Sequence, residues 1–228
     1  MLSRAPHTYP IRPHNTMISI AEIHRKLDAQ GWCIVEREDS ILDLACEFGK
    51  PISTKQDGTL IDRLHVVDAK AAYPNSLSSR FGTGAFPFHT DGAHHRIVPR
   101  YLFLRLHWPE FSYRATLLLD LISEINKKEH AVLKSDIWKV TNGNRYYLSP
   151  VISSLGLRYD PVAMKPAIPG SSQSKEIIHR ITEEVTPVSV TWHKGFVLLV
   201  DNHRMIHSRA PARDGHKGER VLERVLVI

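Results

Sequence analysis

The chain has 228 residues, enough for one domain with a substantial core and an enclosed site. Its composition, 42% hydrophobic and 24% charged, is close to the globular average and excludes the disordered and fibrous classes. The formal net charge of +6 attracts polyanions in general, but the basic residues are scattered and form no dense block with interleaved aromatic residues. Nucleic acid is therefore not the expected partner.

Targeting and redox signals are also weak. No apolar run approaches the length of a membrane span, so no membrane association is expected. Residues 1–17 are rich in proline and lack an apolar core, which predicts a flexible N-terminal arm followed by a single domain over residues 18–228. The two cysteines, Cys33 and Cys46, form no CxxC pattern and favour a reducing cytoplasm.

The first predicted elements are mainly helical. Residues 18–30 have helical periodicity and end before Gly31, after which residues 32–36 read as a short buried strand. Ser40 is a plausible N-cap for a second helix that runs to Phe48 and is stopped by Gly49.

From residue 64 onward, short apolar runs separated by turn signals predict a mostly β structure. One helix is expected at residues 174–184. Strands are expected at residues 64–67, 86–89, 101–106, 114–121, 136–140, 146–151, 188–200 and 220–228. Many short strands with a few early helices favour a mainly β fold with flanking helices, a double-sheeted barrel or jelly roll.

A possible metal site begins with His89 and Asp91. They stand two residues apart, so on an extended segment both side chains point to the same side. Such a pair is weak by itself in a chain with 14 histidines, where a hydrogen-bonded or exposed pair is the commoner outcome. A further histidine, His207, would complete a two-histidine, one-carboxylate face that leaves positions open on iron(II).

Residues able to bind a carboxylate accompany this triad. Arg220 follows His207 by thirteen residues and begins a strand-like run, where its guanidinium could clamp a carboxylate with two hydrogen bonds. Thr116 could add a hydroxyl to the same carboxylate. Arg224 shares a strand face with Arg220, which leaves two alternatives: contact with a bound ligand's acidic group, or a structural ion pair.

Together these residues resemble the taurine dioxygenase and gamma-butyrobetaine hydroxylase-like family of Fe(II)- and 2-oxoglutarate-dependent oxygenases. The resemblance covers most of the chain, and it departs from the family pattern at Ser208, where Gly is common, and at Phe196, where an acidic residue is usual. It implies a double-stranded β-helix, a cupin-like jelly roll. The segments that carry it are residues 31–35, 48–51, 86–92, 99–101, 192–195, 201–202, 207–209 and 218–220.

The resemblance also implies roles for individual residues. His89, Asp91 and His207 would bind iron as the catalytic centre, while Thr116 and Arg220 would hold the distal carboxylate of the cosubstrate 2-oxoglutarate. The implied reaction consumes O2, releases succinate and CO2, and oxidises an unactivated C–H bond of a small polar substrate such as an amino acid or natural-product intermediate. Because the related halogenases have a small residue in place of Asp91, hydroxylation or desaturation is expected here.

Substrate contacts are predicted at Arg224, at Arg158 in the variable middle region, and at Ser79 just before the metal-binding segment. For Arg158 and Ser79 the competing reading is a purely structural or loop role. Asn202 and Arg209 flank His207 and either orient it or stabilise a turn.

Two other functions remain open. A nucleic-acid or protein-modifying oxygenase of the same superfamily is compatible with the basic pI, but no base-stacking lid is visible in the sequence. The other is a non-catalytic β-barrel that binds a small ligand, or a metal for structure. Against it, a structural metal site is usually closed by a fourth protein ligand. The sequence carries no prediction of the oligomeric state.

Overall fold

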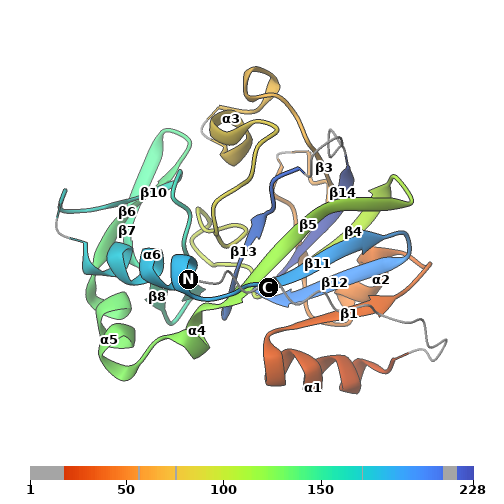
Figure 1. Ribbon diagram of the computed structural model, residues 1–228, viewed down its shortest axis with the longest axis horizontal. Helices are drawn as coiled ribbons and strands as arrows, with labels where there is room; N and C mark the ends of the chain where they lie inside the picture. The colour runs from red at the N-terminus through yellow and green to blue at the C-terminus, as the bar shows by residue number, and fades with distance from the viewer. Residues whose placement is uncertain (1–17, 56, 75, 171, 213–219) are drawn as a thin grey trace, which may run out of the picture.

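The computed structural model describes residues 18–55, 57–74, 76–170, 172–212 and 220–228. The predicted arm at residues 1–17 lies outside the described residues. Two facing antiparallel sheets form the centre of the molecule, with two helices below them and a separate layer of strands and helices at one side (Figure 1). This arrangement confirms the predicted mainly β fold with flanking helices.

The larger sheet has six strands in the order β1-β12-β4-β14-β2, and β3 also pairs with β14. All of these pairs are antiparallel, although their strands come from both ends of the chain. The strands are β1 (Trp32–Glu36), β2 (Pro51–Ile52), β3 (Asp62–His65), β4 (Tyr101–Trp108), β12 (Phe196–Asp201) and β14 (Val221–Val227).

The smaller sheet has three strands in the order β11-β5-β13. Its strands are β11 (Val188–His193), β5 (Phe111–Asp120) and β13 (Met205–Arg209). Alternate residues of β4 and β14 point between the sheets, where Leu104 and Leu222 pack against Trp192 and Met205. The space between the sheets is therefore a filled core, and polar residues that enter it must have partners.

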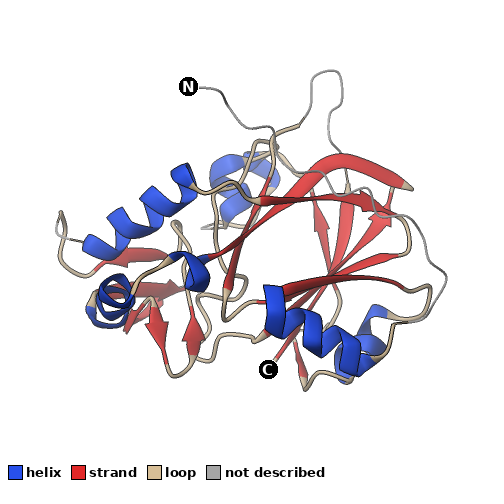
Figure 2. Ribbon diagram, turned by 60° about the horizontal axis from the view of Figure 1, so that its bottom comes forward, coloured by secondary structure: helices blue, strands red, loops and turns tan. Residues whose placement is uncertain are grey.

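The other face of the larger sheet is covered by α1 (Ile20–Gln30) and α2 (Ile41–Cys46) (Figures 1 and 2). Ser19 caps α1 at its start, and Gly31 ends it in the left-handed conformation with φ 80°. Ile23 and Leu27 are buried against Phe103 and its neighbours on the sheet. Burial of this apolar stripe, rather than helix propensity, stabilises the short helices.

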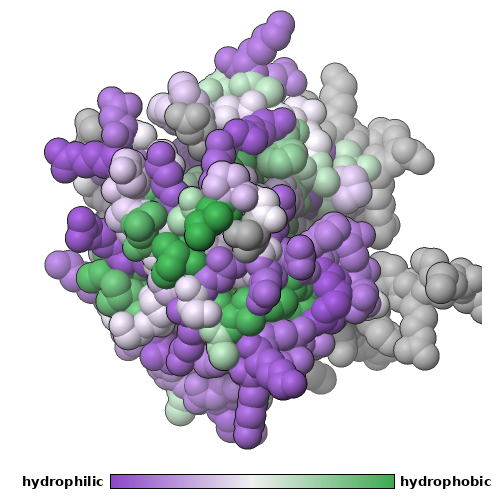
Figure 3. Space-filling view, turned by 90° about the vertical axis from the view of Figure 1, so that its left-hand side faces the viewer, coloured by the Kyte–Doolittle hydropathy of each residue, from purple (hydrophilic) through white to green (hydrophobic). Residues whose placement is uncertain are grey.

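A second layer lies beside the two sheets and has its own core around Leu133, Trp138 and Ile178. Its outer face carries hydrophobic side chains in a broken group among hydrophilic ones (Figure 3). Its elements are α4 (Leu121–Glu124), α5 (Lys127–Ser135), β6 (Ile137–Asn142), β7 (Arg145–Pro150), β8 (Ile152–Ser153), β9 (Gly156–Leu157), β10 (Met164–Pro166) and α6 (Gln173–Glu184).

The short helices η1 (Ala69–Ala71) and α3 (Leu77–Phe81) lie in the long connection between β3 and β4, at the top of Figure 1. No helix among the described residues combines the length and apolarity that a bilayer crossing requires.

Several predicted elements are confirmed and two are wrong. The strand at residues 32–36 and the helices at residues 18–30 and 174–184 agree with β1, α1 and α6 to within two residues. Residues 86–89 do not form a strand: only His89 makes a bridge, to His207, because Pro87 has no N–H to continue a ladder. Residues 188–200 are two strands in different sheets, separated by a turn at Gly195.

Candidate metal centre

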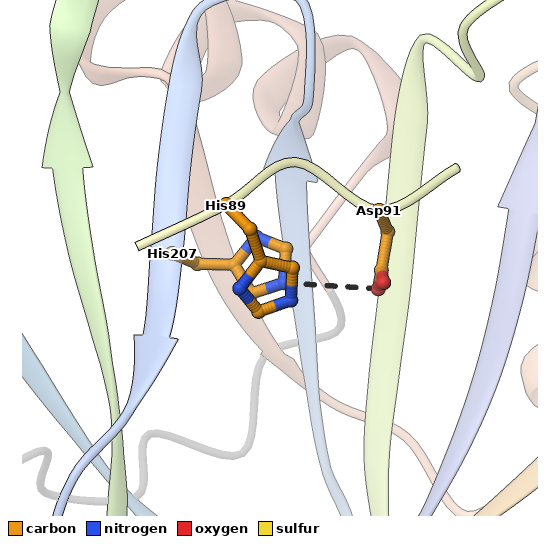
Figure 4. A group of neighbouring side chains, drawn as sticks. All are labelled: His89, Asp91 and His207. Carbon is orange, nitrogen blue, oxygen red and sulfur yellow. Dashed lines mark ion pairs between the residues drawn. The ribbon is translucent and has the colours of Figure 1, made fainter. Parts of the chain in front are cut away.

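His89, Asp91 and His207 come together at one point between the sheets. Their nitrogen and carboxylate oxygen atoms all lie within 4.8 Å of one another, close enough for the three residues to hold one metal ion. His89 and Asp91 project from the same segment, and His207 projects from β13 beside it (Figure 4). Paired backbone hydrogen bonds of 2.9 Å between His89 and His207 fix the spacing of the two segments.

Each ligand presents a free donor atom to the shared position. The Nδ1 atom of His89 lies 2.9 Å from the carbonyl oxygen of Pro87, and since a carbonyl only accepts, the proton is on Nδ1 and Nε2 is free. The Nε2 atom of His207 faces Oδ2 of Asp91 at 3.7 Å, the contact drawn as a dashed line in Figure 4. Two imidazole nitrogens and one carboxylate oxygen are the donor set typical of non-heme iron(II) sites.

The protonation states also suit a metal. Burial opposes the ionisation of Asp91, but attraction from Arg224, His207 and His89 outweighs it and lowers the pKa of Asp91 to about 2. Burial and repulsion from His89 lower the pKa of His207 to about 3. At neutral pH the carboxylate is therefore ionised and the His207 imidazole neutral, which are the forms that bind metal.

The Asp91 side chain is held by Arg224 of β14. Arg224 donates from Nη1 to Oδ1 of Asp91 and from Nη2 to Oδ2 of Asp62, each at 2.8 Å. Sequence reasoning left Arg224 between a ligand contact and a structural ion pair, and the structure shows ion pairs with two carboxylates. Asp62 was not predicted, because nothing near it in the sequence marks β3 as the neighbour of β14.

The Asp91 backbone is held separately by Asn202. The Asn202 amide accepts from the Asp91 N–H at 3.1 Å and donates to the carbonyl oxygens of Asp91 and Pro99 at 2.9 Å. Asn202 is fully buried. Its side chain bonds to the backbone of Asp91 and Pro99 and makes no described hydrogen bond to His207, so it positions the Asp91 backbone.

Thr116 and Arg220 meet through Trp192. The Trp192 indole donates to the Thr116 hydroxyl at 3.1 Å, and the Arg220 guanidinium lies 5.7 Å from the Trp192 ring centroid. Arg220 also donates to the carbonyl oxygen of Arg114. Burial and repulsion from Arg209 and Arg114 lower the pKa of Arg220 to about 9, which is still above neutral pH, so the guanidinium remains charged.

The neighbouring arginines bind backbone rather than acids. Arg114 donates to the Thr83 carbonyl at 2.6 Å, and Arg209 donates to the Gly84 carbonyl at 2.6 Å and lies over the Phe86 ring. Arg209 therefore anchors the segment that leads to His89 and Asp91, and its side chain makes no described hydrogen bond to His207. Within the described ranges, no carboxylate forms an ion pair with Arg114, Arg209 or Arg220.

The two remaining predicted residues lie in the surrounding loops. Arg158 is buried and donates to the carbonyl oxygens of Ala93, His95 and Arg96, so it fixes the loop that follows Asp91. Ser79 is in α3 and donates to the Ser76 carbonyl at 2.7 Å. Their substrate contacts stay predictions.

Comparison with known proteins agrees with this architecture. No family model matches the chain. A curated protein from Fischerella ambigua (strain UTEX 1903), 3-((Z)-2-isocyanoethenyl)-1H-indole synthase, is 24% identical over 236 aligned residues, which cover 90% of this chain and 82% of the relative.

Solved structures show the same fold at lower identity. An asparagine oxygenase in complex with Fe(II), 2S,3S-3-hydroxyasparagine and succinate is 18% identical, with a TM-score of 0.69 over 91% of this chain and 77% of that one. The non-heme iron oxygenase OrfP in complex with Fe, succinate and (3S)-hydroxy-L-Arg is 19% identical, with a TM-score of 0.68 over 91% of this chain and 80% of that one. The chain therefore has the double-stranded β-helix fold of these oxygenases.

Proposed function

We propose that this protein is an Fe(II)- and 2-oxoglutarate-dependent dioxygenase of the taurine dioxygenase-like group. The observation that carries the proposal is the convergence of His89, Asp91 and His207 within 4.8 Å, buried, on the fold of non-heme iron oxygenases. A barrel that only bound a small ligand would not need three buried metal-ligating side chains. A set of three also leaves coordination positions on the metal open, which a purely structural site usually does not.

Iron(II) would be held by the Nε2 atoms of His89 and His207 and by the Asp91 carboxylate. When bound, iron with 2-oxoglutarate and O2 supplies the oxidation of an unactivated C–H bond, with release of succinate and CO2. The chain's own residues fix the donor atoms: Pro87 sets the His89 tautomer, and Arg224 holds one carboxylate oxygen of Asp91.

We assign the distal carboxylate of 2-oxoglutarate to Arg220 and Thr116. Support comes from their shared contact with Trp192 and from the buried positive charge of Arg220, which no described carboxylate neutralises. An arginine and a hydroxyl together recognise a carboxylate by charge and by directed hydrogen bonds. We therefore predict that the 2-oxoglutarate carboxylate neutralises the buried charge of Arg220.

The proposed reaction is hydroxylation, or a related oxidation such as desaturation, of a small amino acid or natural-product intermediate. The ligands named in the solved relatives, hydroxyasparagine and hydroxyarginine, and the indole product named in the curated relative support this substrate range. We keep Arg224, Arg158 and Ser79 as predicted substrate contacts. For Arg224, the Nε atom makes no hydrogen bond with the described residues, so such a contact does not require the loss of either carboxylate partner.

The remaining assignments follow from the sequence. We propose a single oxygenase domain over residues 18–228, a cytoplasmic location in keeping with the free cysteines Cys33 and Cys46, and a small-molecule substrate in preference to nucleic acid. The nucleic-acid alternative gains no specific support, since the buried arginines Arg114 and Arg209 face backbone carbonyls.

The proposal is tested by adding Fe(II) and 2-oxoglutarate to the protein without oxygen and recording the visible spectrum. The wild type should develop a weak charge-transfer band, the His207→Ala variant should not, and the Arg220→Ala variant should require far more 2-oxoglutarate. A matched control is His179→Ala, a histidine exposed on α6. Absence of iron binding and of the band in wild type would refute the proposal; a positive result leads to a substrate screen by succinate release.

A further inference from the structure

Arg224 is shared between two buried carboxylates. It donates to Asp91 and to Asp62 at 2.8 Å each, and both acids are largely buried. Asp62 lies directly opposite Arg224 in the β3–β14 ladder, so the strand pairing itself sets this contact. The Asp62 carboxylate also accepts from the Thr54 hydroxyl at 2.7 Å and lies 3.3 Å from the Lys55 ammonium.

The two carboxylate oxygens of Asp91 have different neighbours. Arg224 occupies Oδ1, while Oδ2 faces Nε2 of His207 at 3.7 Å. A carboxylate held in this way offers one oxygen to a metal and leaves the rest of the metal's face open. The position of the Arg224 guanidinium therefore decides how Asp91 is presented.

Charge balance explains why a second carboxylate is needed. Without Asp62, the Arg224 cation would stand beside the metal site with only Asp91 to offset it. A divalent ion bound by Asp91 draws on that same negative charge, so an uncompensated arginine would repel the ion and compete for the ligand. Asp62 supplies a separate negative charge that remains with Arg224 after the metal binds.

We infer that Asp62 is a positioning residue for the metal centre, acting through Arg224 to hold Asp91 as a one-oxygen ligand and to offset the arginine's charge. The inference rests on the proposed iron site and extends it to a residue that does not touch the metal. It predicts that removing the Asp62 charge weakens iron binding while the three ligands stay in place.

The test is an anaerobic Fe(II) titration of Asp62→Asn, which keeps the shape of the side chain and an oxygen acceptor but removes the charge. The dissociation constant for Fe(II) should rise about tenfold, the lower end of the range for residues that orient metal ligands. The thermal midpoint of the metal-free protein should be recorded alongside.

Glu223→Gln is the matched control. Glu223 neighbours Arg224 on β14 but points to the opposite face, where its buried carboxylate pairs with Arg105 at 2.7 Å. Both variants neutralise one buried acid that pairs with an arginine directly opposite it, across the β3–β14 ladder for Asp62 and across the β4–β14 ladder for Glu223. A merely structural role for Asp62 would lower both thermal midpoints and leave iron affinity alike in the two variants, which would overturn the inference.

An Arg224→Gln background provides the second test. If Asp62 acts through Arg224, adding Asp62→Asn to this background should change the Fe(II) dissociation constant by less than twofold, because coupled residues are non-additive. If the double variant instead binds Fe(II) ten times more weakly than Arg224→Gln alone, Asp62 does not act through Arg224 and the inference is overturned. If wild type binds no iron, the proposed function fails with it, whereas wild-type-like affinity in Asp62→Asn overturns the inference alone.

Discussion

Asn202 shows how one residue holds the candidate metal centre in place. It is fully buried, and its amide satisfies the N–H and carbonyl of Asp91 together with the carbonyl of Pro99. Removing it would leave three backbone groups without partners in a site that water cannot easily enter.

Asn202→Ala should therefore lower the free energy of unfolding by about 2–4 kcal/mol, the range for breaking a buried hydrogen-bond network. Iron affinity should fall as well, because the backbone of Asp91 loses its support. Urea denaturation and Fe(II) titration measure the two effects. Asn142→Ala is the control: this exposed asparagine donates only to the His94 carbonyl at 3.4 Å, so a change within about 0.5 kcal/mol is expected. Equal losses in both variants would contradict the role of Asn202.

At the residue scale, local sequence predicts ligands better than their supports. His89 and Asp91 share one short motif, and His207 was identified because it lies thirteen residues before Arg220. Asp62 has no such signal, since its importance arises only when β3 pairs with β14. The second alternative for Arg224, a structural ion pair, could be stated from the sequence, but its two partners could not.

At the scale of elements, strands were predictable where apolar residues alternate or cluster, as in β1 and β4. The sequence of β13 has only two apolar residues, Met205 and Ile206, and its burial depends on pairing with β5. Helix α5 is polar on most faces and has little hydrophobic periodicity, so it was not predicted from the sequence. The capping box formed by Asn126 and Glu129 was a local signal that could have identified its start.

The junction of β6 and α6 gives a pH-dependent prediction. Burial opposes the ionisation of Asp136, but hydrogen bonds from the side chain and backbone of Ser174 and from the Ser172 hydroxyl outweigh it and lower the pKa of Asp136. Because the folded pKa is below the unfolded value, the ionised carboxylate stabilises the fold above the unfolded pKa. That contribution is lost as the pH falls through the folded pKa.

Asp136→Asn should therefore be less stable than wild type at pH 7 by about 1 kcal/mol. The difference should shrink as the pH falls below about 4, the ordinary aspartate range. Urea denaturation of both proteins at several pH values measures the difference, in which the other titrating groups cancel. A difference that stays constant down to pH 3 would show that the carboxylate charge is not what anchors α6.

At the scale of the whole molecule, charge is distributed unevenly between the interior and the surface. Surface ion pairs such as Lys194 with Glu110 contribute little. Inside, Arg114 and Arg209 lie close enough to Arg220 to lower its pKa, and no described carboxylate pairs with any of the three arginines. Buried positive charge without a described carboxylate partner costs stability, and this cost is expected if a bound anion completes the proposed cosubstrate site.

Arg220→Met tests this trade between stability and binding. The free variant should unfold no more easily than wild type, because replacing an uncompensated buried cation by an apolar chain of similar length offsets the loss of its single hydrogen bond to the Arg114 carbonyl. In the presence of Fe(II), adding 2-oxoglutarate at about 100 times its dissociation constant should raise the stability of wild type by about 2.7 kcal/mol and its thermal midpoint by about 5–10 °C. Arg220→Met should gain far less from 2-oxoglutarate.

Arg158→Met separates this effect from the general cost of losing a buried arginine. Arg158 is as well buried as Arg220, but it satisfies three backbone carbonyls and contacts the Tyr147 hydroxyl, so its removal leaves acceptors unpaired. The free Arg158→Met variant should therefore be clearly destabilised while Arg220→Met is not. If differential scanning fluorimetry finds both variants equally destabilised, Arg220 stabilises the fold and is not an anion-binding residue. The 2-oxoglutarate carboxylate would then have to bind elsewhere in the barrel.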